Sequence, residues 1–120
     1  MKIAVTAQGQ NPDSLVEQRF GRTNWFVLYD SDTRTYSYIE NSMVANAAQG
    51  AGIQSAQNIA NNSVNIVITG NCGPKAFRAL DTAGIKLILN VSGTVQECID
   101  KWEKGFFSYA TSPNSTSHGV

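Results

Sequence analysis

This chain of 120 residues has no net charge, only two cysteines and no long apolar run. Nine Lys and Arg balance nine Asp and Glu, so no overall field attracts nucleic acid or an anionic membrane. The two cysteines, Cys72 and Cys98, show no Cys-x-x-Cys pairing and no metal-finger spacing, which fits a reducing compartment. The amino end lacks the apolar core of a signal peptide, and no run approaches transmembrane length. We therefore expect a cytoplasmic protein without nucleic-acid or membrane partners.

Enzymatic motifs are also absent from the sequence. The first predicted strand, residues 2–7, lacks the carboxylates that a two-metal nuclease needs on its central strands. The chain has neither the spacing of a phosphate loop nor a GxGxxG fingerprint. A nucleophilic pair would require Cys72 to meet the only histidine, His118, from the end of the chain. We therefore expect a protein that is not an enzyme.

The length suits one domain, which we expect to span residues 1–108. We expect a flexible C-terminal tail over residues 109–120, because the stretch after Gly105 is rich in Ser, Thr, Asn and Pro. His118 falls in this tail. We interpret it as a mobile surface residue, with metal capture as the less favoured alternative.

Five segments have the pattern of β-strands. The second contains five consecutive large apolar residues, Trp25 to Tyr29, as expected of a strand buried on both faces. The third places Tyr36 and Tyr38 on one face. The five expected strands span residues 2–7, 24–30, 35–41, 64–69 and 85–90. The first three are expected to form an antiparallel meander.

Three helices are expected in the second half of the chain. Apolar residues recur at helical spacing from Ile53, and Pro74 occupies a position where proline favours a helix start. The third helix begins with a capping box, residues 94–97, and ends near Gly105. The predicted fold class is therefore α/β, with a five-stranded mixed sheet of three antiparallel and then two parallel strands, and three helices.

Three loops, residues 8–23, 42–52 and 70–73, are predicted to meet at one edge of this sheet, because the crossovers between parallel strands are right-handed. Ligands in open α/β sheets bind at such an edge. The third loop opens the helix at Pro74, whose start offers unpaired N–H groups and the positive end of a dipole to an anion. We expect a pocket with backbone donors, two guanidinium groups and an aromatic wall. The candidate binding residues are Arg19, Phe20, Gly21, Arg22, Gly50, Gly52, Gly70, Asn71, Cys72, Gly73 and Lys75.

Some of these candidates have purely structural alternatives. A thiolate at Cys72 would be stabilised by the helix dipole and could ligate copper or another soft metal, or Cys72 could simply fill a turn. Cys98 lies on the apolar stripe of its helix, so we expect it to pack in the core. Gly50 and Gly52 could shape the turn into their helix, and only the convergence of the loops makes them binding candidates.

The charged candidates have alternatives as well. Arg19 and Arg22 could bind an anion, which we favour, or could be solvated or paired with Asp13 and Glu17. Lys75 opposes the helix dipole at its position, which indicates a nearby anion or a merely solvated cation.

Several motifs resemble the dinitrogenase iron–molybdenum cofactor biosynthesis family, and within it the small single-domain orange proteins. The resemblance covers residues 1 to about 105, and its motifs are 19–22, 48–54, 69–80 and 83–86. It implies a ribonuclease H-like motif. It also implies that the chain carries or stores an anionic molybdenum–copper sulfide cluster, or one of the iron–molybdenum type, without covalent attachment. Partners of such proteins in anaerobes include ATPases and cofactor-assembly proteins.

Family members devoted to the iron–molybdenum cofactor often use histidine, whereas this chain has only His118. We therefore expect Arg19, Arg22 and the loop N–H groups to hold the cluster by charge-assisted contacts, with Cys72 as an optional ligand. The alternative function is a cofactor-free interaction module in which the same loops dock on an ATPase or another partner.

Overall fold

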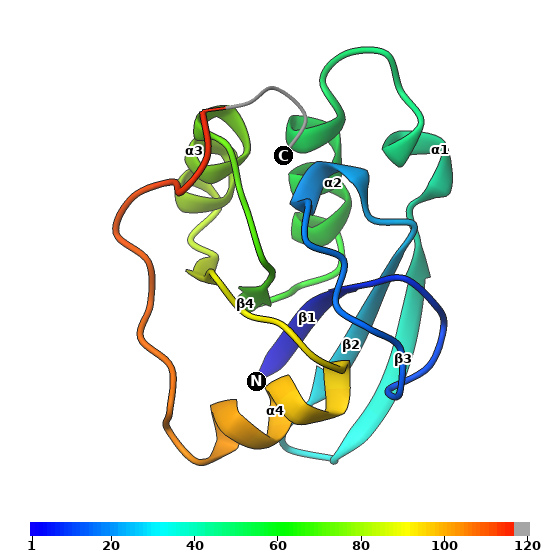
Figure 1. Ribbon diagram of the computed structural model, residues 1–120, viewed down its shortest axis with the longest axis vertical. Coiled ribbons are helices and arrows are strands. Elements are labelled where there is room, and N and C mark those ends of the chain that lie inside the picture. Colours follow the sequence, from blue (N-terminus) through cyan, green and yellow to red (C-terminus); the bar gives the residue numbers. More distant parts are fainter. Residues whose placement is uncertain (117–120) are drawn as a thin grey trace.

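In the computed structural model, which describes residues 1–116, a twisted five-stranded sheet lies between two helices on one face and one helix on the other (Figure 1). The strands are β1 (Lys2–Ala7), β2 (Trp25–Asp30), β3 (Thr35–Glu40), β4 (Ile66–Ile68) and β5 (Lys86–Ile88). Their order across the sheet is β3-β2-β1-β4-β5. β1, β4 and β5 are parallel, whereas β2 is antiparallel to both of its neighbours. The predicted α/β class and mixed sheet of the ribonuclease H-like motif are confirmed.

The burial of each strand explains its pattern of apolar and polar residues. Every residue from Ile3 to Ala7 is buried, because both faces of β1 are covered by helices. β3 is an edge strand, and each of its residues is exposed or half-buried. β4 and β5 are shorter than the predicted segments 64–69 and 85–90, because the chain leaves the ladder at both ends while remaining largely buried.

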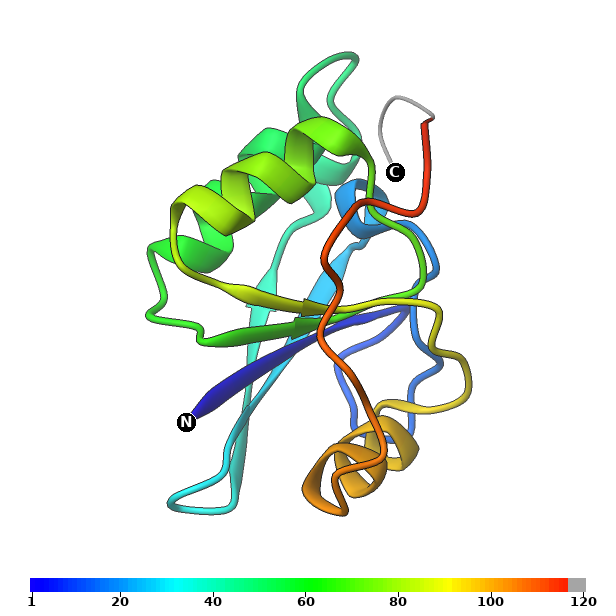
Figure 2. The same ribbon diagram turned by 90° about the vertical axis from the view of Figure 1, so that its left-hand side faces the viewer.

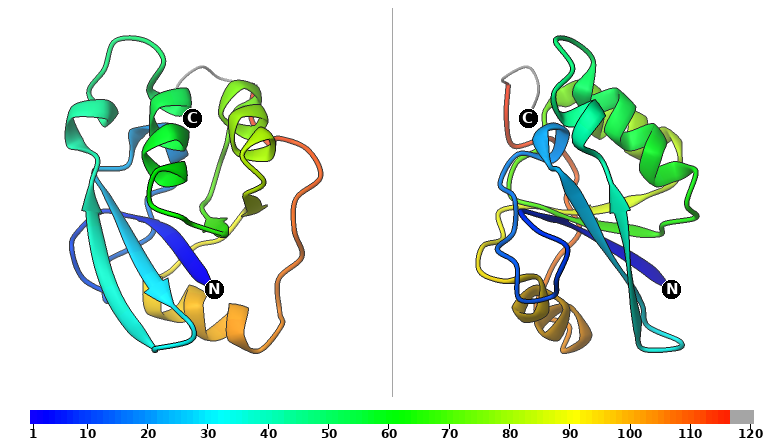
Figure 3. Two further views of the ribbon diagram at one scale, coloured as in Figure 1. Left: turned by 180° about the vertical axis from the view of Figure 1, so that it is seen from behind. Right: turned by 90° about the vertical axis from the view of Figure 1, so that its right-hand side faces the viewer.

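The three predicted helices are α2 (Ala51–Ala60), α3 (Pro74–Thr82) and α4 (Val95–Glu103). Figures 2 and 3 show α2 and α3 together on one face of the sheet and α4 on the other. Two short elements were not predicted, the single-turn helix α1 (Ser42–Ala45) and the 3-10 turn η1 (Phe20–Arg22). Neither is long enough to show a helical period, and neither has a side-chain cap at its start.

Each face of the sheet has its own apolar core. On the α4 face, Val5 and Ile68 pack with Ile99 and Cys98, so Cys98 is the buried core residue that the helical stripe predicts. α4 begins with the predicted capping box, in which the Thr94 hydroxyl accepts from the N–H of Glu97. The expected tyrosine face of β3 is turned towards α4, where Tyr36 donates its hydroxyl proton to the Gln96 amide oxygen at 2.8 Å.

The segment after α4 runs back beside β5 to the edge where the parallel strands end (Figure 2). The N–H of Ala110 donates to the carbonyl of Leu87 at 2.7 Å, and Phe107 packs against the core of the α4 face. Through residue 116 the predicted tail therefore makes contacts that its composition did not indicate. His118, the tail histidine considered as a metal ligand, lies outside the described residues. No helix within residues 1–116 has the length and hydropathy to cross a bilayer.

Candidate functional site

The first and third loops join at the carboxyl ends of β1 and β4, as the topology predicts. Asn71 donates its N–H to the Gln18 carbonyl at 2.6 Å and accepts from the N–H of Phe20 at 3.0 Å. The backbones approach so closely that a methyl group at Gly70 would lie 2.8 Å from the Gln18 carbonyl oxygen. Gly70 is therefore required by the junction of the two loops, and Asn71 forms that junction through its backbone.

Arg22 joins the first loop to the second. Its Nη1 group donates to the carbonyls of Ala45 at 2.9 Å and Ala47 at 2.8 Å, just where α1 ends. In the described part of the chain, neither Arg22 nor Arg19 forms an ion pair with Asp13 or Glu17. Arg22 therefore positions the second loop, and its guanidinium group is partly used in doing so.

Buried polar side chains near the strand ends form hydrogen bonds that fix these loops. The Thr6 hydroxyl at the end of β1 donates to the Glu17 carbonyl at 2.7 Å and lies 2.8 Å from the Thr69 hydroxyl. Asn41, after β3, donates to the Thr23 carbonyl at 2.9 Å and to the Ser55 hydroxyl of α2 at 3.0 Å. The sequence does not distinguish these residues, because isolated Thr and Asn at strand ends carry no distinctive spacing.

α2 and α3 start side by side at this edge of the sheet, and both run away from it (Figure 2). A methyl group at Gly52 would lie only 3.1 Å from the Cβ of Ala76, so the absence of a side chain allows the two starts to touch. Gly50 precedes α2 with a φ of 74°, a left-handed conformation that favours glycine. Neither helix carries an acidic residue in its first turn, so two positive dipole ends point to one edge.

Two cations at this edge have no carboxylate partner in the described part of the chain. Arg19, just before η1, is exposed, and only its backbone N–H contacts Glu17, at 3.2 Å from the carboxylate. Lys75 is exposed in the first turn of α3, whose cap residue is the buried Gly73. Within residues 1–116 the only ion pair joins the amino terminus to Asp32, at the opposite end of β1. Arg19 and Lys75 are therefore free to attract an anion.

The aromatic wall expected at Phe20 is wrong. Phe20 is completely buried and packs against Phe26 with ring centroids 5.8 Å apart, in the core of the α2–α3 face. Gly21 is buried beside it. Phe20 anchors η1 to the core because its ring gains more from burial than from exposure at a polar edge.

Of the two alternatives at Cys72, the structure favours a residue that fills the turn over a thiolate. Cys72 is completely buried, and burial raises the pKa of its thiol to about 12. The Sγ atom lies 3.6 Å from the Gly73 carbonyl, to which the thiol donates. Cys72 is therefore a neutral core residue, and its role as a metal ligand gains no support from the geometry.

One residue at this edge was missed altogether. The N–H of Cys72 donates to the amide oxygen of Asn114 at 2.9 Å, so the C-terminal segment reaches the third loop. Asn114 lies in a stretch of low complexity, and only its Pro113-Asn114 turn dipeptide distinguishes it in the sequence.

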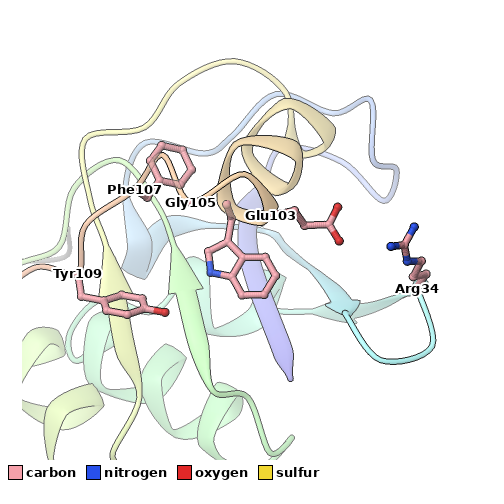
Figure 4. Close-up of a pocket in the computed structure, with 6 residues that line it drawn as sticks. Arg34, Glu103, Gly105, Phe107 and Tyr109 are labelled. Atoms are coloured by element: carbon pink, nitrogen blue, oxygen red, sulfur yellow. The ribbon is translucent and has the colours of Figure 1, made fainter.

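A hollow of about 520 Å³ lies at the other end of the sheet, beside the β2–β3 turn. Figure 4 shows Arg34 on that turn and Tyr109 on the C-terminal segment at opposite sides of it. The hydroxyl of Tyr29 donates to the Glu103 carboxylate at 3.0 Å and holds it in the rim. A fixed carboxylate repels anions, and Arg34 is the one cation in this described lining. The opposite edge also has a carboxylate, Glu17, but it combines Arg19 and Lys75 with two helix starts and is therefore the better anion site.

These features define a class of small α/β proteins that present a basic, glycine-rich sheet edge beside two helix starts. The chain belongs to one family of such proteins, because the family model described as dinitrogenase iron-molybdenum cofactor matches residues 1–105.

Individual relatives agree with this assignment. The apo form of the orange protein from Desulfovibrio gigas is 39% identical, with a TM-score of 0.93 over 95% of this chain and 96% of that chain. A Thermotoga protein of the DUF35 family is 30% identical, with a TM-score of 0.84 over 97% of this chain and 98% of that chain. An uncharacterized protein of Methanocaldococcus jannaschii is 31% identical over 108 residues, or 88% of this chain and 87% of that protein.

Proposed function

We propose that this chain is a non-catalytic carrier or storage protein that binds an anionic, molybdenum-containing metal–sulfide cluster at the edge where β1 and β4 end. The observation that carries the proposal is the pair of helix starts at this edge, with Arg19 and Lys75 beside them and without a carboxylate partner among residues 1–116. Membership of the iron–molybdenum cofactor family and the likeness to the orange protein support a cluster as the cargo.

The donors at this edge suit a sulfide cluster held by charge rather than by ligation. Bridging and terminal sulfides are acceptors of hydrogen bonds, and backbone N–H groups at helix starts donate to anions. No three His, Cys, Asp or Glu residues within residues 1–116 lie close enough to hold a metal ion. Cys72 keeps its proton at neutral pH because burial raises its pKa to about 12. We therefore favour a molybdenum–copper sulfide cluster, or one of the iron–molybdenum type, as a detachable cargo.

The proposed cluster also suggests the compartment and the partners of the protein. Sulfide clusters persist in reducing compartments, and both cysteines are free in this structure. We therefore place the protein in the cytoplasm, where an ATPase or a cofactor-assembly protein would deliver or remove the cluster.

The test is anaerobic uptake of tetrathiomolybdate with copper(I), followed by visible absorption and metal analysis. Wild type is expected to take up the cluster, and Arg19→Gln with Lys75→Gln is expected to weaken binding about tenfold, because two exposed charge contacts are lost. The matched control is Arg34→Gln with Lys86→Gln, which removes the same charge elsewhere and is expected to bind as wild type does.

Two results would count against this proposal. A wild-type protein that stays colourless and takes up no metal contradicts cluster binding. Equal weakening by the two double variants contradicts the location, because it makes net charge rather than this edge the cause.

A second candidate function is a cofactor-free interaction module, which a groove of about 460 Å³ between α2 and α3 favours. The groove is lined mainly by small apolar side chains, Ile53 is partly exposed in it, and Lys75 and Arg78 are its charged residues. Its described lining includes no acidic residue. These features fit an acidic amphipathic helix of a partner such as an ATPase. An acidic helical peptide should then bind wild type and the control Lys86→Glu, but not Arg78→Glu.

A further inference from the structure

The C-terminal segment is hydrogen-bonded into the third loop through one side chain. The Nδ2 group of Asn114 donates to the Gly70 carbonyl at 2.9 Å, to the Asn90 amide oxygen at 2.8 Å and to the Asn71 amide oxygen at 3.3 Å. Its Oδ1 atom accepts from the N–H of Cys72 at 2.9 Å. The Nδ2 group has two hydrogens and three nearby acceptors, so two of these acceptors share one hydrogen. Both hydrogens and the oxygen of the Asn114 amide are therefore hydrogen-bonded.

These four contacts are not equivalent. The amide groups of Asn71 and Asn90 are at least partly exposed, so water can replace Asn114 there. Cys72 is completely buried, so its N–H needs another acceptor whenever Asn114 leaves. Since an N–H group serves one strong acceptor at a time, Asn114 and an anion at this donor exclude each other.

The rest of the segment is placed to cover the same edge. Pro113 and Asn114 line a hollow together with Pro74, the first residue of α3. Figure 2 shows this stretch crossing the edge of the sheet beside the start of α3. Upstream, the backbone bond from Ala110 to Leu87 holds the segment to β5. Thr111 and Ser112 between these two attachments are exposed, so the end of the segment can lift while its base stays on β5.

We propose that residues 110–116 are a latch, with Asn114 occupying in the empty protein the acceptor position that a sulfide of the cargo takes in the loaded protein. The latch deepens the proposed function and depends on it. An empty protein is closed because Asn114 satisfies the Cys72 N–H. The cargo opens the latch because its sulfide replaces Asn114 as the acceptor, so loading and unlatching are one equilibrium.

The empty protein offers a test that needs no cargo. In Asn114→Ala, amide hydrogen exchange at Cys72, measured by NMR, is expected to be about tenfold faster than in wild type, because the N–H loses its acceptor. The control is Ser112→Ala, an exposed residue of the same segment, and its exchange at Cys72 is expected to match wild type. Unchanged exchange in Asn114→Ala overturns the latch.

Loading provides the second test, with tetrathiomolybdate and copper(I) as the probe. The affinity of Asn114→Ala is expected to exceed that of wild type about tenfold, because the cargo no longer competes with the side chain. In wild type, exchange of the Asn114 side-chain amide hydrogens, measured by NMR, is expected to accelerate on loading, because they lose the Gly70 and Asn90 acceptors. Ser112→Ala should follow wild type in both measurements.

The pattern of results separates the two proposals. Equal affinities of wild type and Asn114→Ala, with exchange of the Asn114 side-chain amide in wild type unaffected by loading, overturn the latch and leave the cluster carrier standing. No uptake by wild type, Ser112→Ala or Asn114→Ala overturns the cluster carrier and, with it, the latch. Uptake by Asn114→Ala alone also overturns both proposals for the natural chain, because its cargo must be able to open the latch.

Discussion

Arg19 and Arg22 flank the same turn but have different surroundings. Arg22 donates to the carbonyls of Ala45 and Ala47, whereas the guanidinium group of Arg19 forms no ion pair within residues 1–116. In the sequence they form one symmetrical motif, and nothing in their spacing separates them. The structure therefore divides one predicted pair into a residue that shapes the site and a residue that is free to bind.

These different surroundings predict that the two arginines contribute unequally to stability. Arg22→Ala is expected to lower the free energy of unfolding by about 1–2 kcal/mol, because two carbonyls at the end of α1 lose a charged donor. Arg19→Ala is expected to change it by less than about 0.5 kcal/mol, because an exposed side chain without a partner is removed. Urea denaturation measures both values. Equal losses in the two variants would refute the assignment of separate roles.

At the scale of elements, the contact between α2 and α3 determines the shape of the site. Their starts touch because Gly52 has no side chain and Ala76 has only a methyl group. A wider separation would move the two positive dipole ends apart and weaken their combined field at the edge. The closeness of the helices is therefore a requirement of the site as well as of the core.

A double-mutant cycle tests this contact. Gly52→Ala introduces a methyl group 3.1 Å from the Cβ of Ala76, and Ala76→Gly removes the obstacle. We expect the double variant to be more stable than the sum of the single changes by about 1 kcal/mol, measured by urea denaturation. The control cycle pairs Gly52→Ala with Ala79→Gly, farther along α3, and is expected to be additive. Additivity in both cycles would show that the helix starts are not in tight contact.

Most elements were predictable because their signals are local. Pro74 and the capping box at Thr94 indicate where two helices begin, and the apolar run before Gly70 indicates where a strand ends. The burial of Phe20 was not predictable, because a single aromatic residue between two arginines suits a pocket wall and a core anchor equally well. Asn114 was not predictable either, since its partners are distant in sequence and its surroundings have the composition of a tail.

At the scale of the whole molecule, ionisable groups are buried on both faces of the sheet. Burial raises the pKa of Cys72 from 9.0 to about 12 on the α2–α3 face and that of Cys98 from 9.0 to about 11 on the α4 face. Burial and the Glu103 carboxylate also raise the pKa of Tyr29 above its usual value of 10.0. All three groups favour their neutral form in the folded protein.

Stability is therefore expected to decline in alkali. Below about pH 9 the thiols are neutral in both states, but above it they ionise in the unfolded chain and stay neutral in the fold until about pH 11 to 12. The free energy of unfolding should fall by about 1 kcal/mol per pH unit for each thiol in this range. Urea denaturation from pH 8 to 11 measures the slope. Cys72→Ala with Cys98→Ala should flatten it, and an unchanged slope would contradict the origin in the thiols.

The two outer strands of the sheet differ in what covers them. The bond from Ala110 to Leu87 places the C-terminal segment along part of β5, whereas no described segment pairs with the outer edge of β3. An additional strand can therefore join this sheet most readily at β3. Aggregation through strand pairing should begin there, and exposed Ser37 and Glu40 are the polar side chains that oppose it. Ser37 lies in the middle of β3, away from the edge proposed to bind the cluster, so it can be altered for solubility without changing that edge.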